Sequence, residues 1–235
     1  MLTDAHTHIL YDIDDGAKDI SESVKLIEAE IANGVGVVIL TPHFDPYKDS
    51  LELFARKRGE RYEILSRYIN ENNKNIILIP GSETVYSPAL MYYGTLKPLC
   101  IGNTRCLLLE FDSGMKFDKE FFTELQKLTQ KFDIIPDIAH TERYEHIKKH
   151  IKIIEKLKKA GCVIQINAGH IIRNIESKFV KDLFARNYAD IIASDCHDSR
   201  KRRPNLKEAI LLINEKYDGY YDKRLLNKYK FIREK

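Results

Sequence analysis

Residues 4–8 of the chain read Asp4-Ala5-His6-Thr7-His8, at the end of the first expected strand. Side chains of an extended strand alternate with a period of two, so His6 and His8 point the same way and one metal ion can take both. Potential metal ligands also follow most later apolar runs. They stand in Asp14-Asp15-Gly16, Thr41-Pro42-His43, Gly81-Ser82-Glu83, Leu109-Glu110-Phe111, Ala139-His140-Thr141-Glu142-Arg143 and Ser194-Asp195-Cys196-His197. The pattern indicates a metalloenzyme.

Seven short apolar runs alternate with segments of helical period, which is the pattern of repeated βα units around a parallel sheet. The expected strands cover residues 2–4, 35–40, 76–79, 106–110, 134–138, 163–166 and 191–193. In a parallel βα barrel, the loops that follow the strands share one face. We therefore predict an α/β barrel whose strand ends bring the quoted residues together.

Three expected helices carry an apolar stripe that would pack on the sheet. The first is capped by Asp19 or Ser21 and ends at Gly34, which can take the left-handed conformation that stops a helix. Its stripe consists of Ile20, Val24, Ile27 and Ile31. The other stripes cover residues 121–132 and 147–157, the latter ending at Gly161. Pro136 lies inside the fifth strand and weakens the pairing expected there.

Length and composition predict one soluble domain over residues 1–235. The chain has 43% hydrophobic and 31% charged residues and a formal charge of +3, which is too mild to predict a nucleic-acid or membrane partner. No apolar stretch is long enough to span a bilayer, and the first candidate ligand at position 6 leaves no room for a signal peptide, so we expect a cytoplasmic protein. The four scattered cysteines predict neither disulfides nor a zinc knuckle. Composition does not predict the oligomeric state.

A single carboxylate after a strand is more often a helix cap or a loop residue than a ligand. The joint pattern reverses this expectation. Glu83 and Glu110 follow apolar runs, where a carboxylate is costly to bury unless it is paired or bound to a metal. These two residues therefore add most to the metal hypothesis.

The motifs together resemble the polymerase and histidinol phosphatase (PHP) superfamily, and they look most similar to the bacterial manganese-dependent tyrosine-protein phosphatases of capsule and exopolysaccharide operons. Asp14-Asp15-Gly16 and Ala139-His140-Thr141-Glu142-Arg143-Tyr144 point to that subgroup, and the resemblance runs from residue 2 to about residue 217. It implies a distorted seven-stranded barrel with three divalent metal ions. Manganese is expected, although histidine and carboxylate ligands also suit iron or zinc.

Carried over position by position, the resemblance implies nine metal ligands. One ion would be held by His6, His8, Glu83 and Asp195, a second by the bridging Glu83 with Glu110 and His140, and a third by Asp15, His43 and His197. Clustered divalent ions polarise phosphoryl oxygens and generate hydroxide from water, so no protein nucleophile is needed. We therefore expect phosphomonoester hydrolysis through in-line attack by hydroxide.

Arginine suits the binding of a phosphoryl group because its planar fork donates two hydrogen bonds at once. Arg143 is the first candidate, and Arg202 in Arg200-Lys201-Arg202-Arg203 is the second. The family usually has Arg-Pro-Pro here, whereas this chain has Arg-Arg-Pro, which leaves the choice between Arg202 and Arg203 open. We count Arg143, Arg202 and His43 as catalytic candidates, and Arg143, Arg202 and Arg203 as substrate-binding candidates.

The resemblance also implies a substrate, namely a phosphotyrosine-containing protein such as a bacterial tyrosine kinase that controls polysaccharide export. A small-molecule phosphatase, acting for example on histidinol phosphate, and a nuclease are alternatives that the ligands alone do not separate. A third alternative is a non-catalytic barrel that only binds a partner. Such a protein is expected to lack some of the metal ligands, whereas all nine are present in this chain. The basic run near Arg202 lacks the interleaved aromatic residues of a nucleic-acid site.

Cys196 and Arg202 have the Cys-x5-Arg spacing of cysteine-dependent phosphatases. Such a loop needs small residues whose amides cradle phosphate, but here Asp198 intrudes and no glycine is present. We therefore expect Cys196 to play no part in catalysis.

The remaining histidines have simpler interpretations. His146 and His150 lie among lysines and are expected on a solvated helix face. His170 follows the sixth strand and lies near the predicted site, in either a supporting or a structural role. The basic tail over residues 222–235 is expected to be a solvated end rather than a closing helix.

Overall fold

Parallel strands form the centre of residues 2–222, the part of the chain that the computed structural model describes. The strands are β1 Leu2–Thr7, β2 Val35–Leu40, β3 His43–Phe44, β4 Ile77–Pro80, β5 Glu83–Val85, β6 Cys106–Glu110, β7 Ile135–Ile138, β8 Val163–Asn167 and β9 Ile191–Ala193. Each of the seven predicted strands is present. β3 and β5 were not predicted.

The strands pair in two parallel sheets rather than in one closed seven-stranded sheet. The first has the order β1-β2-β4 and the second β3-β5-β6-β7-β8-β9. Two-residue breaks separate β2 from β3 at Thr41-Pro42 and β4 from β5 at Gly81-Ser82. Pro42 has no N–H to donate to a ladder, so the pairing is interrupted there. An isolated parallel bridge between Thr7 and Cys196 connects the end of β1 to the segment after β9.

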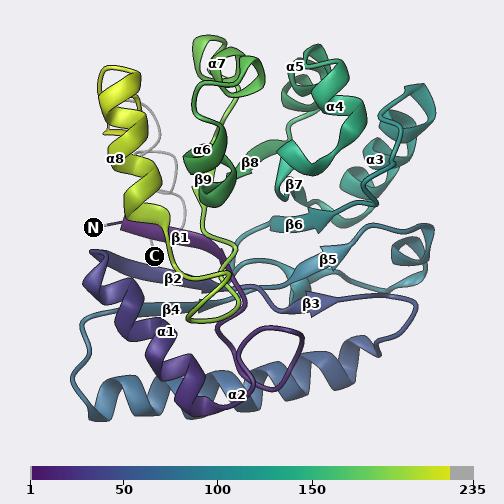
Figure 1. The fold of residues 1–235 in the computed structure, drawn as a ribbon. Helices are drawn as coiled ribbons and strands as arrows, with labels where there is room; N and C mark the ends of the chain where they lie inside the picture. Colours follow the sequence, from purple (N-terminus) through teal and green to yellow (C-terminus); the bar gives the residue numbers. More distant parts are fainter. Residues whose placement is uncertain (1, 223–235) are drawn as a thin grey trace.

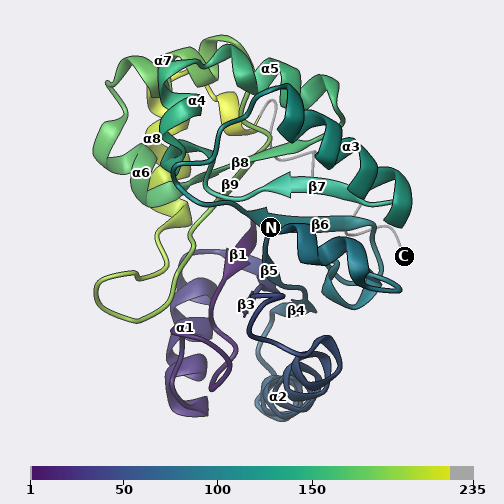
Figure 2. The ribbon, with the colours of Figure 1, turned by 90° about the vertical axis from the view of Figure 1, so that its right-hand side faces the viewer.

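Helices cover the outside of the strands, as Figure 1 shows. They are α1 Ile20–Ala32, α2 Leu51–Glu71, α3 Lys119–Phe132, α4 Glu145–Lys149, α5 Lys152–Lys159, α6 Ala168–Asn174, α7 Lys178–Ala185 and α8 Leu206–Lys216, with 3₁₀ turns η1 Pro88–Tyr92, η2 Lys97–Leu99 and η3 Thr141–Arg143. α1 and α2 lie below β2 and β4 in this view, whereas α3 to α8 lie above the other strands. Turning the molecule shows the same division (Figure 2).

The first predicted helix is α1, and its N-cap is Asp19, whose side chain accepts a hydrogen bond from the N–H of Glu22. Gly34 follows with a φ of 77°, as its predicted stop requires. The helix predicted over residues 147–157 is wrong in one respect: it is divided into α4 and α5, because His150 between them has a non-helical φ of −134°. Residues 223–235 of the predicted tail lie outside the described residues.

Two apolar clusters stabilise the fold. The larger joins the outward faces of the strands to the helices, while the smaller brings together buried side chains such as Ala5 of β1, Ile39 of β2, Cys106 of β6 and Ile191 of β9. Contact among strands so far apart in sequence means that the sheets curl toward one another. Between residues 2 and 222, no helix is both long and apolar enough to cross a membrane.

Candidate metal centre

All nine predicted metal ligands lie where the parallel strands finish. They come from β1 and its following loop, from β3, β5 and β6, and from the segments after β7 and β9. Eight of them form three groups in which the nitrogen and oxygen atoms lie within 4.8 Å of one another. The groups are His8, Asp15, His43 and His197; His6, His8 and Asp195; and His43, Glu83 and Glu110. Because His8 and His43 are shared, the groups form one continuous cluster.

Glu83 lies at the middle of this cluster and is almost fully buried. Its Oε2 atom is 3.1 Å from Nε2 of His6, 3.3 Å from Nε2 of His8 and 3.1 Å from Nδ1 of His43. Its Oε1 atom is 2.8 Å from Nε2 of His140, the ninth candidate. The two oxygens thus face different histidines, as a bridging carboxylate would.

The grouping differs from the implied one in two places. His43 stands between groups, with Nε2 3.6 Å from Oδ1 of Asp15 and Nδ1 near Glu83. His8 belongs both to the group of Asp195 and to that of His197. The assignment of residues to individual ions therefore stays a prediction.

Two of the histidine rings are held through Nδ1, which turns their Nε2 atoms toward the cluster. Nδ1 of His8 is 2.6 Å from Oδ2 of Asp14, and Nδ1 of His197 is 3.1 Å from the main-chain oxygen of Asp195. Nε2 of His197 is buried and has no hydrogen-bond partner among the described residues. A neutral imidazole that donates through Nδ1 keeps its Nε2 lone pair for a metal. These two rings are oriented as metal ligands require.

The ring of His6 faces the side-chain amide of Gln165. Nε2 of Gln165 is 2.8 Å from Nδ1 of His6, while its Oε1 is buried without a hydrogen-bond partner among the described residues. A half-turn of the amide would let Oε1 accept the Nδ1 proton of His6, in exchange for the hydrogen bond that Nε2 donates to Oδ1 of Asn167 at 3.3 Å. Nε2 of His6, which lies 3.0 Å from Nε2 of His8, is then available to a metal.

Charge in the cluster is balanced by protons when no cation is bound. Burial opposes the ionisation of Glu83, but His6, His140 and His8 outweigh it and hold the pKa of that carboxyl well below its ordinary value. Burial likewise disfavours a charged His8, yet Asp14 and Glu83 raise its pKa to about 10. Divalent cations can replace these protons. Convergent imidazole and carboxylate donors fit a centre for divalent metals. Among them, the buried Nε2 of His197 lies 3.5 Å from Oδ1 of Asp15 and makes no hydrogen bond within the described residues.

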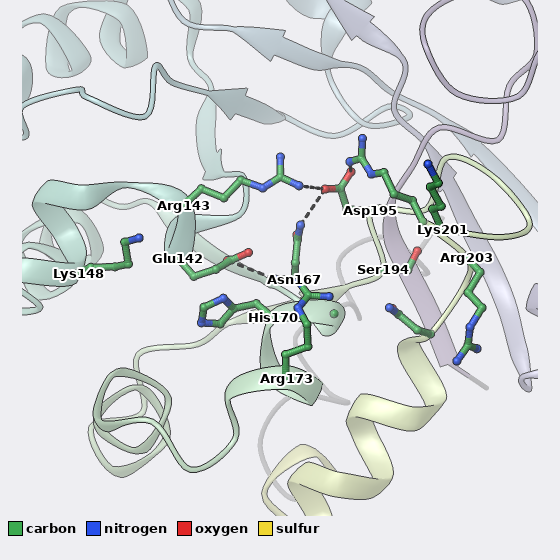
Figure 3. A pocket seen from close by; sticks show the side chains of 13 residues that line it. Glu142, Arg143, Lys148, Asn167, His170, Arg173, Ser194, Asp195, Lys201 and Arg203 are labelled. Carbon is green, nitrogen blue, oxygen red and sulfur yellow. Dashed lines mark hydrogen bonds and ion pairs between the residues drawn. The ribbon is translucent and has the colours of Figure 1, made fainter.

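Two of the three predicted arginines reach the edge of the cluster (Figure 3). Arg143 donates to Oδ2 of Asp195, and Nη2 of Arg202 donates to Oδ1 of Asp195 at 2.8 Å. Arg203 pairs instead with Glu208 at 3.1 Å and is more than half exposed. Of the two positions left open by the sequence, Arg202 lies beside the cluster, whereas the Arg203 guanidinium is paired with Glu208.

The cysteine and the histidines that were not predicted to be metal ligands lie in different parts of the structure. Cys196 is fully buried, and burial raises the pKa of its thiol, so it lacks the accessible thiolate that a nucleophile needs. His146 accepts a hydrogen bond from the N–H of Phe117 at 2.9 Å, a structural role, and His150 is exposed. His170 lines the same cleft as Arg143.

Several supporting residues were not predicted from the sequence. Asp14 holds His8, Gln165 faces His6, and the hydroxyl of Tyr144 lies 3.5 Å from Nδ1 of His140. Asn167 donates to Oδ2 of Asp195 at 2.7 Å. The alternation of Gln165 and Asn167 along β8 is a signal that could have found both, because polar residues two apart on a buried strand share one face.

Fold and site define an α/β protein whose parallel strand ends carry a candidate multinuclear metal centre with arginines at its edge. The chain belongs to the CpsB/CapC family of capsular polysaccharide synthesis, whose model matches residues 2–231. The resemblance noted from the motifs is confirmed.

Curated relatives and a solved structure extend this finding. The chain is 28% identical over 221 residues to tyrosine-protein phosphatase CpsB of Streptococcus agalactiae serotype III (strain NEM316), covering 90% of this chain and 89% of that protein. It is 28% identical over 225 residues to tyrosine-protein phosphatase YwqE of Bacillus subtilis (strain 168), covering 92% and 85%. A crystal structure from work on YwqE of Bacillus subtilis and CpsB of Streptococcus pneumoniae, described as metal-dependent tyrosine phosphatases, matches with a TM-score of 0.84 at 23% identity, covering 99% of this chain and 94% of that one. At 23% identity, this structural match shows that the two chains share a fold.

Proposed function

We propose that this protein is a metal-dependent phosphatase that hydrolyses phosphotyrosine in proteins. The observation that carries the proposal is the cluster of nine candidate ligands with Arg143 and Arg202 at its edge. Divalent ions and arginine forks are the groups that stabilise charge on phosphoryl oxygens. The activity named for curated members of the family supports the same conclusion.

Three divalent ions, manganese before iron or zinc, would occupy the cluster. Their ligands would be His6, His8, Asp15, His43, Glu83, Glu110, His140, Asp195 and His197. When bound, such ions polarise phosphoryl oxygens and lower the pKa of coordinated water. The protein's own part is to fix the ligands: Asp14 orients His8, and Gln165 orients His6.

Arg143 and Arg202 would bind the phosphoryl group. Each guanidinium has five N–H donors, and the hydrogen bond to Asp195 leaves others for phosphoryl oxygens. Arg203 would contribute less because it pairs with Glu208. His43 is the third catalytic candidate, since at 33% exposure it is the most accessible imidazole of the cluster.

We further propose that the two sheets together make a distorted seven-stranded barrel that forms one catalytic domain. This is supported by the two-residue breaks between β2 and β3 and between β4 and β5, and by the bridge from Thr7 of β1 to Cys196 in the segment after β9. The substrate would be a bacterial tyrosine kinase of polysaccharide export, reached in the cytoplasm. A crystal structure of the metal-loaded protein would test the strand pairing and the ligand assignment together.

The activity is tested by removing metals with a chelator and restoring manganese, iron or zinc in turn. We expect the restored protein to hydrolyse a phosphotyrosine peptide faster than histidinol phosphate or single-stranded DNA, and the chelated protein to be inactive. Replacing Arg202 with Ala should lower kcat/KM on the peptide by roughly 100-fold, because a donor to developing charge is lost. The matched Arg203→Ala change should cost no more than about threefold.

Two outcomes would contradict the proposal. Activity that survives complete metal removal would exclude the metal mechanism. A restored protein that prefers histidinol phosphate or DNA would assign it to one of the other phosphoester-hydrolysing classes.

A further inference from the structure

A cationic cleft extends outward from the metal centre beyond Arg143 and Arg202. It has a volume of about 400 Å³ and is lined by residues of η3, α4, α6 and the segment before α8. Six of its thirteen lining residues are arginine or lysine, whereas Glu142 and Asp195 are its carboxylates. Glu142 is buried, and burial raises the pKa of its carboxyl, which reduces the negative charge it adds. Cations therefore outnumber carboxylates among the residues that line the cleft.

The cations at the inner and outer ends differ in their partners. Arg143 and Arg202, at the inner end, both donate to Asp195. Arg173, at the outer end in α6, is exposed, and no carboxylate of residues 2–222 lies within ion-pair distance of it. Figure 3 shows its guanidinium directed up into the cleft, below Asn167. A guanidinium placed this way can bind an acidic group of a ligand.

Gly169 lines the outer end of the cleft. A Cβ atom at this position would lie 3.2 Å from Nη1 of Arg173 and 3.3 Å from Nδ2 of Asn205, so these two donors converge over the bare glycine. Oδ1 of Asn205 is buried and has no hydrogen-bond partner among the described residues. The Nδ2 group of Asn205 is thus a hydrogen-bond donor beside the Arg173 guanidinium for an acceptor atom of a ligand.

Lys148 and His170 complete the outer end. Burial first, and then Arg173 and Lys148, lower the pKa of His170 to about 4, so its ring is neutral at physiological pH. Both cations line the same cleft as His170. Lys148 has Glu145 as its ion-pair partner, which leaves Arg173 as the stronger anchor.

We propose that Arg173, with Asn205 over Gly169 and with Lys148 farther along the same cleft, forms a subsite for a second acidic group next to the phosphotyrosine of the substrate. This inference rests on the proposed phosphotyrosine phosphatase activity and assigns its substrate class: peptides that carry a carboxylate or a second phosphate near the scissile phosphotyrosine. Arg143 and Arg202 bind the scissile phosphate, and Arg173 binds the second acidic group of the peptide.

The test compares three peptides of equal length on the metal-restored enzyme. Their phosphotyrosine is flanked by glutamine, by glutamate, or by phosphonomethyl-phenylalanine, a non-hydrolysable phosphate analogue. We expect the wild-type enzyme to favour both acidic peptides over the glutamine peptide in kcat/KM, mainly through KM. Arg173→Gln should reduce this preference by about three- to fivefold, the effect of one partly screened charge pair.

Two further variants keep the test specific. Gly169→Ala places a methyl group against the Arg173 guanidinium and should also weaken the preference. Because residue 169 lies in α6, where alanine is favoured over glycine, this variant should keep the fold. Arg56→Gln, an equal loss of charge on an exposed position of α2 outside the cleft, should keep the wild-type preference. Preference for the glutamate peptide alone or the phosphonate peptide alone would identify which acidic group the subsite takes.

The failures are distinguishable. A wild-type enzyme that hydrolyses all three peptides equally, or a preference that survives in Arg173→Gln, overturns the subsite and leaves the phosphatase activity standing. An enzyme that hydrolyses no phosphotyrosine peptide after metal restoration overturns the proposed function and the subsite with it.

Discussion

Cys196 illustrates at the level of one residue how burial decides chemistry. Its thiol lies between two proposed ligands in sequence, yet it points into the protein, where Sγ donates to Oε1 of Glu30 at 3.7 Å. We predict that Cys196→Ser keeps kcat/KM on a phosphotyrosine peptide within about threefold of wild type, because no bond to the substrate is lost. Steady-state kinetics on metal-loaded protein measure this. Loss of activity with normal metal content and folding would contradict it.

Two proposed ligands have an unusual backbone conformation. His140 has a φ of 30° and Asp195 a φ of 55°, both in the left-handed region. Histidine and aspartate are among the non-glycine residues that tolerate this region best, and strained backbone gathers at functional sites. A sequence pattern does not reveal such a conformation, because it depends on the tertiary contacts that hold each residue in place.

The loop between β1 and α1 is the element most constrained by a single glycine. A Cβ on Gly16 would lie 2.1 Å from the main-chain oxygen of His8, which already accepts a hydrogen bond from Ala17. We predict that Gly16→Ala displaces the loop, lowers the free energy of unfolding by about 2–4 kcal/mol and removes bound metal. The loss of metal follows because Asp14 and Asp15 move with the loop. Urea unfolding and elemental analysis of the purified variant check both effects.

Gly59→Ala is the matched control for that change. Gly59 lies within α2, and nothing would come within 4 Å of a Cβ there. Alanine in a helix interior is favoured over glycine by about 1 kcal/mol, so this variant should be slightly stabilised and keep its metal. Equal behaviour of the two variants would show that Gly16 has no special role in the loop.

Elements with long apolar patterns could be predicted from the sequence, and short or interrupted ones could not. β2 and β6 are continuous apolar runs, and each lies where it was predicted. β3 and β5 consist of two and three residues that include His43 and Glu83, too short and too polar for a periodic signal. The break at His150 was missed because the apolar stripe continues across it.

For the molecule as a whole, the sequence was sufficient to predict that the nine candidate ligands converge. It did not predict the residues that contact and orient their histidine rings. Parallel strands bring their carboxyl ends to one edge, so position after a strand was sufficient to place His6 and Asp195 together. Asp14, Gln165 and Tyr144 act through contacts with particular rings, which depend on loop path and strand register. Those contacts are set by tertiary packing rather than by local pattern.

The stability of the whole molecule should depend on pH through Asp137, a fully buried carboxyl of β7. Its neighbours along the sheets are Leu108 and Val163, and its Oδ1 has no hydrogen-bond partner among the described residues. Burial, and then the negative charge of Asp190, raise the pKa of Asp137 to about 8. The folded protein therefore keeps a proton on Asp137 at pH values where the unfolded chain has lost it.

The sign of the dependence follows from proton linkage. Below the ordinary carboxyl pKa of about 4, both states hold the proton, so the titration of Asp137 makes no contribution to stability. As the pH rises from about 4 to about 8, the unfolded chain releases the proton and the folded protein does not, so stability falls. The loss has an upper limit of roughly 6 kcal/mol, from 1.36 kcal/mol for each pKa unit. Above pH 8 the contribution is constant.

We therefore predict that Asp137→Asn, which resembles the protonated carboxyl, gains stability relative to wild type as the pH rises from 5 to 8. Urea unfolding of both proteins in the presence of a chelator measures the difference, in which the titration of all other groups cancels. Asp133→Asn removes the same formal charge at a side chain that is 79% exposed, and it should give a difference that stays constant over this range. Parallel stability curves for Asp137→Asn and wild type would mean that Asp137 ionises in the folded protein as readily as in the unfolded chain, which its burial and the charge of Asp190 oppose.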